Sequence, residues 1–544
     1  MAPKAASSAS ATTLYRLTGV NNLQIAVRKK YLNDEKFQSV ACSVGDREAL
    51  LVHGHMKTAR VAWAERLGSL IKVPFEASNQ NAAAVLLIKG QAHTVWALAY
   101  GMGFHVLDQG RVDPGFGQRV AIRVAEADNL SSLTSKTMDN RAKVDRSSIP
   151  SGSQLSGFGL GDFGQLVTRV VATARIDGLT VGKAFKVRGA DALNLPLACS
   201  AESLLADLTL IEETLKTEPP TELRILEQLF ALKKDNPTTI ALDKLLEMAL
   251  LDASDENAAV AWPHEGVNEN GTPAAFVVKG RGPKVPREGV PTIHAIRDAI
   301  NPKNVLASLN QTKIQLFSDP DGQNPISSDI ALRKWIAFEQ TLDGQRYFLH
   351  DGRWYLMDQN YAAQLQARVH EIFDQTYGLT LPPWPYVDGE KICEKKYNEL
   401  AAPHIGGWVL DRKLIRTIQN RRGFETCDIL APDGALIHVK NADASAPISH
   451  LFAQGHNSAH CLTHDQQARE EFGALVAKVG GDQSLVADKP TAVVFAIARH
   501  TGKPFGPNNL YSFSQVTLVR TAEELAARGI KVYVAPIENG PCDR

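Results

Sequence analysis

Residues 424–440 of this 544-residue chain read Phe-Glu-Thr-Cys-Asp-Ile-Leu-Ala-Pro-Asp-Gly-Ala-Leu-Ile-His-Val-Lys, and they decide the fold of its C-terminal part. The centre of the stretch, Ala431 to Ala435, has Pro, Asp and Gly in the order that a tight turn requires. Proline presets φ at the first turn position, and glycine accepts a left-handed conformation at the third. A three-residue loop of this kind pairs Ala431 with Ala435, so the stretch predicts a β-hairpin.

The register of this hairpin places polar residues on one face. Counting outward from the turn, Asp428 lies opposite His438, and Thr426 lies opposite Lys440. Side chains alternate along a strand, so these four share a face. The reverse face is apolar and carries Cys427, Ile429, Ile437 and Val439. An acid, an imidazole and an ammonium group on one rigid platform could bind a metal and activate water; a solvated face with incidental charges is the simpler interpretation.

The composition is typical of a soluble globular protein, with 44% hydrophobic and 22% charged residues. Basic and acidic residues both number 59, so nucleic-acid binding would need a local basic patch. The sequence has no apolar run of the length that spans a bilayer, and its first residues lack the apolar core of a signal peptide. Six scattered cysteines without a CxxC motif indicate reduced thiols. We therefore expect a cytoplasmic protein without a membrane partner.

A chain of this length is expected to form about two to four domains. Leucines at helical spacing and a later stretch dense in Gly and Pro mark two of the boundaries. The predicted order is a disordered tail (1–13), an N-terminal α+β domain (14–198), a helical region (199–261), an irregular linker (262–292), an α+β connecting region (293–387) and a C-terminal domain (388–544).

Two features of the N-terminal domain are open to interpretation. Residues 120–123, Val-Ala-Ile-Arg, are short and apolar, which favours a strand. Two basic groups lie further along, and they suggest either a basic groove or solvated loop charges: Arg141, Lys143 and Arg146, then Lys183, Lys186 and Arg188.

The C-terminal domain has a readable order of elements. A helix over 388–402, which carries Glu390 and Glu394, precedes a strand-like segment over 408–415 and the hairpin. Then follow a helix over 449–479 interrupted near Gly455, a buried strand over 491–498, a helix over 521–528 and a strand over 530–534. This order predicts an α/β/α layered domain with a mixed central sheet, within a multidomain chain of the α/β class.

This order, with an acid on the second strand and a His-x-Lys tripeptide on the third, resembles the PD-(D/E)XK nuclease superfamily, whose fold is that of restriction endonucleases. The resemblance covers residues 388–544. It implies that Glu394 is the helix acid, Asp428 the strand acid and Lys440 the catalytic lysine. Gln454, on the following helix, resembles a polar residue that supports the site. The resemblance also implies a divalent metal, Mg²⁺ or Mn²⁺.

One position departs from the family's pattern, because His438 stands where the family has Glu or Asp. Imidazole is a suitable ligand for Mn²⁺ or Zn²⁺ but a poor one for Mg²⁺. Either the metal differs, or Glu425 or Asp433 supplies the missing carboxylate, or the site is weakened. The expected metal ligands are Asp428, Glu394 and His438.

Two further clusters bear on function. Basic residues just before the hairpin could grip nucleic-acid phosphates, with a solvated face as the alternative: Arg412, Lys413, Arg416, Arg421 and Arg422. Histidines at helical spacing, His456, His460 and His464, with His450 upstream, could instead bind Zn²⁺ together with His438.

The whole chain also resembles a sporadically distributed bacterial protein family of about 550 residues without an assigned function. The likeness lies in five segments: Glu394-Lys-Lys-Tyr-Asn, Cys427-Asp-Ile-Leu, Leu436-Ile-His-Val-Lys, Ser449-His-Leu-Phe-Ala-Gln-Gly and Tyr511-Ser-Phe-Ser-Gln-Val. A patchy distribution is associated with phage defence or mobile elements, which is association and not mechanism.

These features together predict a cytoplasmic, metal-dependent nuclease that hydrolyses phosphodiester bonds. Its expected partner is nucleic acid, DNA before RNA, and a homo-oligomer is compatible with the sequence. The first alternative is a catalytically inactive nuclease-like protein that binds nucleic acid or acts in assembly. The second alternative is a zinc-stabilised regulatory protein.

Overall fold

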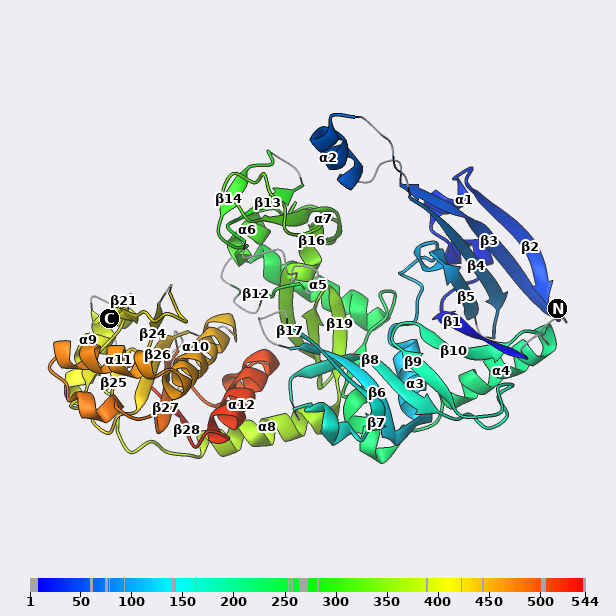
Figure 1. The fold of residues 1–544 in the computed structure, drawn as a ribbon. Coiled ribbons are helices and arrows are strands. Elements are labelled where there is room, and N and C mark those ends of the chain that lie inside the picture. The colour runs from blue at the N-terminus through cyan, green and yellow to red at the C-terminus, as the bar shows by residue number, and fades with distance from the viewer. Residues whose placement is uncertain are drawn as a thin grey trace. The chain divides into compact units, whose positions relative to one another are not determined.

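The computed structural model describes residues 8–541 apart from 59–61, 74–76, 78, 92, 139–142, 162, 253–254, 256–257, 264–272, 281–282, 388–389, 422, 443–444 and 500–504. The fold is mixed α/β with several antiparallel sheets (Figure 1). The chain forms two compact units. The first comprises residues 1–136, 144–160 and 166–240, and the second comprises 137–143, 161–165 and 241–544.

The first unit is built on a ten-stranded sheet in the order β2-β3-β4-β5-β1-β10-β9-β8-β6-β7. Its strands are β1 (Ala9–Leu17), β2 (Phe37–Val44), β3 (Arg47–Thr58), β4 (Asn79–Lys89), β5 (Val95–Gly101), β6 (Ala125–Thr137), β7 (Val144–Ser153), β8 (Gln165–Ala174), β9 (Phe185–Gly189) and β10 (Leu193–Ala198). Its helices are α1 (Lys29–Leu32), α2 (Ala62–Ile71), α3 (Phe116–Val124) and α4 (Ala201–Thr214).

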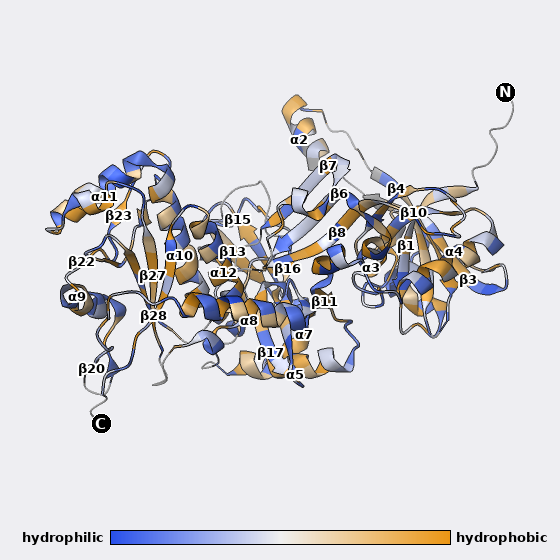
Figure 2. Cartoon of the chain, turned by 90° about the horizontal axis from the view of Figure 1, so that it is seen from below, coloured by the Kyte–Doolittle hydropathy of each residue, from blue (hydrophilic) through white to orange (hydrophobic). Residues whose placement is uncertain are grey.

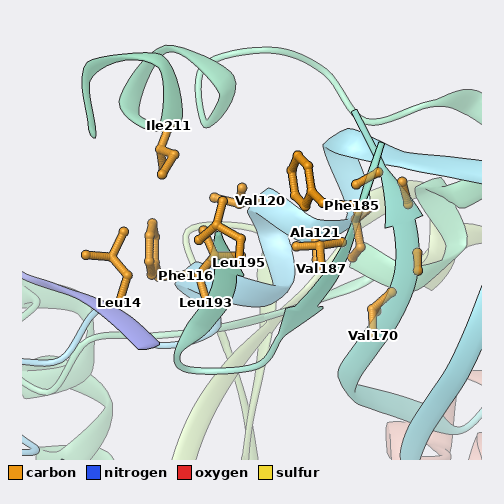
Figure 3. Packing of buried hydrophobic residues seen from close by; sticks show 14 of the residues in the cluster. Leu14, Phe116, Val120, Ala121, Val170, Phe185, Val187, Leu193, Leu195 and Ile211 are labelled. Atoms are coloured by element: carbon orange, nitrogen blue, oxygen red, sulfur yellow. The ribbon is translucent and has the colours of Figure 1, made fainter. Parts of the chain in front are cut away.

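A large apolar core lies between this sheet and helices α3 and α4. Phe116 and Val120 of α3, Leu195 of β10 and Ile211 of α4 are buried in it, as Figure 3 shows. The strand predicted over 120–123 was wrong, because these residues belong to α3. Gly115, with φ of 66°, turns the chain directly before the helix, and the buried residues then recur at helical spacing.

The predicted tail is also shorter than expected. Residues 9–13 begin β1, which pairs with β10 on one side and with β5 on the other. These backbone hydrogen bonds and the burial of Thr12 hold a segment whose Ala and Ser content looked disordered. The first seven residues of the predicted tail lie outside the described residues.

The first half of the second unit has two small antiparallel sheets. One has the order β14-β13-β15-β16, and the other contains β19-β18-β17-β12. The strands are β12 (Ala259–Val260), β13 (Ala275–Lys279), β14 (Pro286–Glu288), β15 (Lys313–Phe317), β16 (Ile330–Ala331), β17 (Ile336–Leu342), β18 (Gln345–His350) and β19 (Arg353–Met357). The helices are α5 (Pro237–Leu251), α6 (Ile293–Asp298), α7 (Val305–Gln311) and α8 (Gln359–Phe373).

The linker predicted over 262–292 is therefore only partly irregular. Residues 275–279 form β13 and pair with β14 and β15, because a run of apolar residues there can be buried on the sheet. Residues 264–272 and 281–282 of that range lie outside the described residues. The division between the two compact units falls at residue 240, within α5.

The C-terminal part of the second unit has a five-stranded sheet in the order β22-β25-β26-β27-β28. Its strands are β22 (Trp408–Val409), β25 (Ile429–Leu430), β26 (Leu436–Asn441), β27 (Ala492–Ala498) and β28 (Lys531–Pro536). The first three pair antiparallel, and β26, β27 and β28 pair parallel. Two short pairs, β20 (Tyr386–Val387) with β21 (Glu390–Lys391) and β23 (Leu414–Ile415) with β24 (Phe424–Glu425), lie outside this sheet.

Helices cover both faces of this sheet. Tyr397 and Ala401 of α9 (Glu394–His404) pack against the face that carries Ile437 and Val494. The other face is covered by α10 (Ser445–His464) and α12 (Ser512–Ala526), and Phe452 of α10 contacts Phe495 edge to face. β27 is buried along its whole length, and Figure 2 shows it in hydrophobic colours. The predicted α/β/α layers and mixed sheet are present.

Two predicted helices differ in detail. The first begins only at Glu394, and Glu390 lies in β21. The predicted interruption near Gly455 was wrong, because α10 runs through it and α11 (Gln466–Lys478) follows. A Cβ at Gly455 would lie 2.5 Å from the Phe495 ring, so this glycine lets α10 approach the sheet closely. Among the described residues, no helix is long and apolar enough to cross a membrane.

Candidate metal centre

The hairpin has the register that the turn predicts. Ile429 pairs with Ile437, and the amide of Ala431 donates to the carbonyl of Ala435 at 3.0 Å. Gly434 has φ of 83°, the left-handed conformation that this turn position requires. The reverse face is buried and apolar as predicted, with Cys427 fully inaccessible. The amide of Asp428 donates to the carbonyl of Ile437 at 3.0 Å, so Asp428 lies beside Ile437 at the end of this pairing and not opposite His438 as predicted.

Beyond Asp428 the strand leaves the hairpin, and the predicted pairing of Thr426 with Lys440 is not formed. Residues 424–425 form β24, which pairs with β23, so that Glu425 lies opposite Leu414. The physical reason is a second partner strand: residues 408–415 bend after β22 and offer β23 as a new edge. As a result, Glu425 faces the loop between β22 and β23.

Asp428 ties that loop to the hairpin. Its carboxylate accepts a hydrogen bond from the amide of Val439 at 2.7 Å. Its backbone carbonyl accepts from the amides of Leu410 and Asp411, at 2.8 and 3.0 Å. The side chain of Asp411 is thereby fixed beside Asp428.

Three carboxylates converge at this point. One oxygen from each of Asp411, Glu425 and Asp428 lies within 4.8 Å of the other two. Glu425 also accepts hydrogen bonds from the amide of Arg412 and, at 2.9 Å, from the side chain of Gln454. Gln454 of α10 therefore contacts one of the three carboxylates. Within the described part of the chain, no other group of three or more acid, His or Cys side chains meets this distance criterion.

The electrostatics of this carboxylate cluster favour a cation. Burial raises the pKa of Asp428 to about 7, and the nearby negative charges of Glu425, Asp411 and Glu394 add to the effect. Burial and the charge of Asp411 also raise the pKa of Glu425. Three carboxylates this close repel one another when ionised, so ionising all three has a high free-energy cost unless a positive charge lies nearby. Oxygen donors of this kind are the ligands that Mg²⁺ and Mn²⁺ prefer, so the donor set fits the predicted metal.

Lys440 and Glu394 form a pair next to the cluster. The ammonium group lies 3.0 Å from one carboxylate oxygen of Glu394, and the amide of Asn441 donates to the other at 3.2 Å. The structure brings these two predicted site residues together. Glu394 was expected to be a direct metal ligand, and it lies near enough to raise the pKa of Asp428. Its carboxylate is nevertheless held by Lys440 and is not a member of the cluster.

His438 is not placed as a metal ligand. Its ring is fully buried beneath α10, with Nε2 3.3 Å from the hydroxyl of Ser458 and the ring of Phe495 nearby. Burial lowers the pKa of His438 to about 3, so the imidazole is neutral. The prediction failed because it treated this face as open, whereas α10 packs on it. Glu425, one of the two replacements considered, lies in the cluster, and the other, Asp433, accepts from Tyr377 in the hairpin turn.

The histidines of α10 form a row on a different side of the helix. His456 Nε2 lies 2.7 Å from Glu524 of α12, and the ring centres of His460 and His464 are 4.6 Å apart. His438 contacts Ser458 and not this row. The predicted zinc site would need these histidines to converge with His438, and the structure does not bring them together.

The basic residues before the hairpin are partly available to a ligand. Arg412, Arg416 and Arg421 are exposed, whereas the ammonium group of Lys413 donates to the carbonyl of Val409 at 2.7 Å. Arg422 lies outside the described residues. Arg412 follows Asp411 directly, so positive charge lies close to the carboxylate cluster.

Comparison with known proteins identifies the family. The model of a family of unknown function, DUF6119, matches residues 12–538. The chain belongs to this family. The match agrees with the predicted resemblance to a family of about this length, and it spans both compact units. No curated protein and no solved structure matches the chain.

Sequence reasoning missed Asp411 as a member of the site. The signal was present, because Asp411 lies within the strand-like segment (408–415) that precedes the hairpin. Pairing that segment with the hairpin's first strand would have placed it beside Asp428. Only the pairing of Val409 with Ile429 reveals this proximity.

Proposed function

We propose that this protein is a metal-dependent nuclease that hydrolyses phosphodiester bonds, with DNA as a better candidate substrate than RNA. The observation that carries the proposal is the convergence of Asp411, Glu425 and Asp428 beside the Lys440–Glu394 pair. Metal-assisted phosphodiester hydrolysis needs carboxylates that hold the cation and a nearby group, such as a lysine, that acts on the water or the phosphate.

The topology of the C-terminal part supports a restriction-endonuclease-like assignment. A helix that begins with an acid, Glu394, precedes three antiparallel strands, and the third strand then continues into parallel pairing. The acid Asp428 precedes the second of these strands, and Lys440 lies on the third. The PD-(D/E)XK resemblance expects the acid on the second strand and the lysine on the third, so Asp428 lies one residue before the expected strand.

Each residue then has a role. Asp411, Glu425 and Asp428 would hold Mg²⁺ or Mn²⁺, which supplies a more acidic water and neutralises charge on the phosphate. Lys440 would hold the attacking water or contact a phosphate oxygen, and Glu394 positions its ammonium group. Gln454 orients Glu425. Hydrolysis adds the water oxygen to phosphorus, breaks the bond to one sugar oxygen and leaves a proton on that oxygen.

The exposed arginines support nucleic acid as the substrate class. Arg412 and Arg416 lie on the segment that contributes Asp411, so a phosphate backbone that reached the cluster would meet them. Such contacts fix position without reading sequence. A bacterial defence or mobile-element setting is the biological context that we propose for this activity.

A second candidate is a nuclease-like protein that binds nucleic acid without cutting it. The observation that favours it is His438, which is buried and neutral at the position where PD-(D/E)XK nucleases have a carboxylate. In this case the carboxylate cluster would be structural, and the arginines would do the binding.

The deciding experiment is a cleavage assay on plasmid, linear duplex, single-stranded DNA and RNA with Mg²⁺ or Mn²⁺. We expect the wild-type protein to cut at least one substrate and Asp428→Asn to lose about a hundredfold or more of the rate. Asp374→Asn is the matched control, because Asp374 is an exposed acid at the end of α8 and should retain full activity. If wild-type protein cuts nothing with either metal, or if Asp428→Asn cuts as well, the nuclease proposal is lost.

A further inference from the structure

The short hairpin formed by β23 and β24 carries Glu425 of the carboxylate cluster and an arginine on the same face. Leu414 pairs with Glu425, so these two side chains point to one side of the hairpin. A Cβ at Gly423 would lie 3.0 Å from Cγ of Arg416 and 3.3 Å from Cβ of Leu414, which places the Arg416 side chain on that side too. Arg416 therefore continues the face of the hairpin that leads to the cluster.

The loop at the tip of this hairpin is held in place by hydrogen bonds. The amide of Gly423 donates to the carbonyl of Asn420 at 2.9 Å, and the amide of Ile418 donates to the side chain of Gln467 in α11 at 3.0 Å. The side chain of Asn420 lies 3.7 Å from Sγ of Cys461 in α10. β23 itself lies beside α11, as Figure 2 shows. Contacts with two helices fix the backbone of the tip, so its side chains are presented in a set geometry.

The tip presents an apolar side chain between two arginines. Ile418 is 76% exposed, the largest exposed fraction among the large hydrophobic residues that the structure describes. Arg416 and Arg421 lie two residues before it and three residues after it, and both are exposed. Among the described residues, neither of them makes an ion pair. This combination matches a ligand that has phosphates on its outside and an apolar interior.

We propose that the β23–β24 hairpin places its tip in the minor groove of double-stranded DNA, with Ile418 inserted against a base step and Arg416 and Arg421 on the flanking phosphates. Apolar wedges of this kind partly unstack a base step and bend the duplex. The contact favours DNA over RNA, because the minor groove of A-form RNA is wide and shallow and does not enclose a narrow tip. Since Arg416 shares a face with Glu425, a phosphate bound to Arg416 lies on the side of the carboxylate cluster.

Contact with phosphates alone does not account for this tip. A surface that binds only the backbone needs cations, and an exposed isoleucine adds nothing to it. An isoleucine that enters the base stack gains the burial that it lacks in the free protein. The inference rests on the proposed function for nucleic acid as the partner, and it deepens that proposal by naming double-stranded DNA. It requires neither a metal nor cleavage.

The wedge is tested on a short DNA duplex labelled at both ends, with the full chain in EDTA so that no cleavage occurs. Energy transfer between the labels should show that wild-type protein bends the duplex by about 20° or more. Ile418→Ala should abolish the bend and raise Kd, measured by fluorescence anisotropy, about tenfold, because the buried apolar contact is lost. The slope of log Kd against log salt should not change, since no charge is removed. The matched control is Ile240→Ala, which removes a 51% exposed isoleucine from α5 and should bind and bend as wild type does.

The double variant Arg416→Gln and Arg421→Gln tests the phosphate contacts. We expect Kd to rise about tenfold or more and the salt slope to fall by about two, since each lost phosphate contact removes about one. The matched control is Arg47→Gln and Arg175→Gln, which removes the same charge from two arginines that each pair with an acid, at 3.6 and 3.1 Å. This control should bind as wild type does. Equal melting temperatures show that the variants fold.

The inference is overturned if wild-type protein does not bind duplex DNA, if it binds single-stranded DNA or duplex RNA as tightly, or if Ile418→Ala keeps both the bend and the Kd. These outcomes are distinct from failure of the proposed function. Cleavage by wild type that Asp428→Asn abolishes, with unchanged bending by Ile418→Ala, would retain the nuclease and remove the wedge. Bending that depends on Ile418 without any cleavage would do the reverse.

Discussion

The backbone amide of Asp411 donates to the backbone carbonyl of Asp428 at 3.0 Å, and the carboxylates of the same two residues lie within 4.8 Å of each other. Backbone hydrogen bonds between two chain segments, this one and that from the amide of Leu410, thus hold two negative side chains together. Folding alone brings these charges close, and their mutual repulsion must be offset by protonation or by a cation.

A divalent cation should stabilise the folded protein through this cluster. We expect Mn²⁺ or Mg²⁺ at about a hundred times its Kd to stabilise the wild-type fold by about 3 kcal/mol, because the unfolded chain lacks the converging carboxylates. Asp411→Asn should remove most of this gain, since one of three ligands is lost. The measurement is the shift in melting temperature with added metal, reversed by EDTA.

Glu399→Gln is a suitable control for the metal effect. Glu399 lies on α9 and is exposed next to Lys395, at 3.9 Å, so its loss changes net charge by one without touching the cluster. This variant should show the wild-type shift. An equal metal shift in Asp411→Asn and wild type would show that the cation binds elsewhere.

Without metal, Asp428 should make stability depend on pH. Its pKa is raised to about 7 in the folded state, against about 4 in an unfolded chain. The folded state therefore holds a proton that the unfolded state has lost between these values. The stability from this group is complete below about pH 4 and is lost as pH rises to about 7, with a slope of up to about 1 kcal/mol per pH unit.

Asp428→Asn isolates this effect, because asparagine does not titrate. In EDTA, the melting temperature of wild type should fall relative to that of Asp428→Asn as pH rises from about 4 to about 7. His438 works in the opposite direction, since its pKa is lowered to about 3 and its stabilisation is lost as pH falls. Its contribution is common to both proteins and cancels in the comparison. A constant difference across this range would contradict the buried, proton-holding carboxylate.

The fold of the C-terminal part was largely predictable from local signals. The Pro-Asp-Gly turn sets the register of the hairpin, and the apolar run of β27 marks a strand buried on both faces. The errors occurred where tertiary packing overrides local preference. Gly455 looks like a helix breaker in sequence, yet its small size is what lets α10 lie against Phe495.

The candidate site was predictable only in part. Asp428 and Lys440 lie near it because both belong to the hairpin. Glu394 of α9 and Gln454 of α10 lie near it through their hydrogen bonds to Lys440 and Glu425. Predicting Asp411 as a site residue would have required the pairing of β22 with β25, which joins residues about twenty positions apart. His438 was misplaced because the sequence pattern shows which face a residue shares, but not which helix covers that face.

Lys440 should be needed for cleavage but not for metal binding. Lys440→Met should lower the cleavage rate about a hundredfold or more, since a positioned acid or base group contributes about 10²–10⁴. The metal-dependent rise in melting temperature should remain, because the lysine is not a ligand. Glu394→Gln should lower the rate less and should not add fully to Lys440→Met, as the two residues form one pair.

The control for the lysine is Lys395→Met, which removes an exposed ammonium group from α9. It should cut at the wild-type rate. Full activity in Lys440→Met would leave the carboxylate cluster as the sole candidate for catalysis and would remove Lys440 from the site.

Gly455 should tolerate no side chain. Gly455→Ala places a Cβ 2.5 Å from Cε1 of Phe495 and 3.1 Å from Val493, so α10 must shift away from the sheet. We expect a loss of about 1–3 kcal/mol, the usual cost of overpacking a core, although alanine is the better helix former. Gly473→Ala in α11 is the matched control, because its nearest neighbour would be 3.6 Å away, and it should be neutral or stabilising. Since α10 also carries Gln454, a shift of the helix should weaken metal binding in Gly455→Ala alone, and calorimetric titration with Mn²⁺ of both variants tests this coupling.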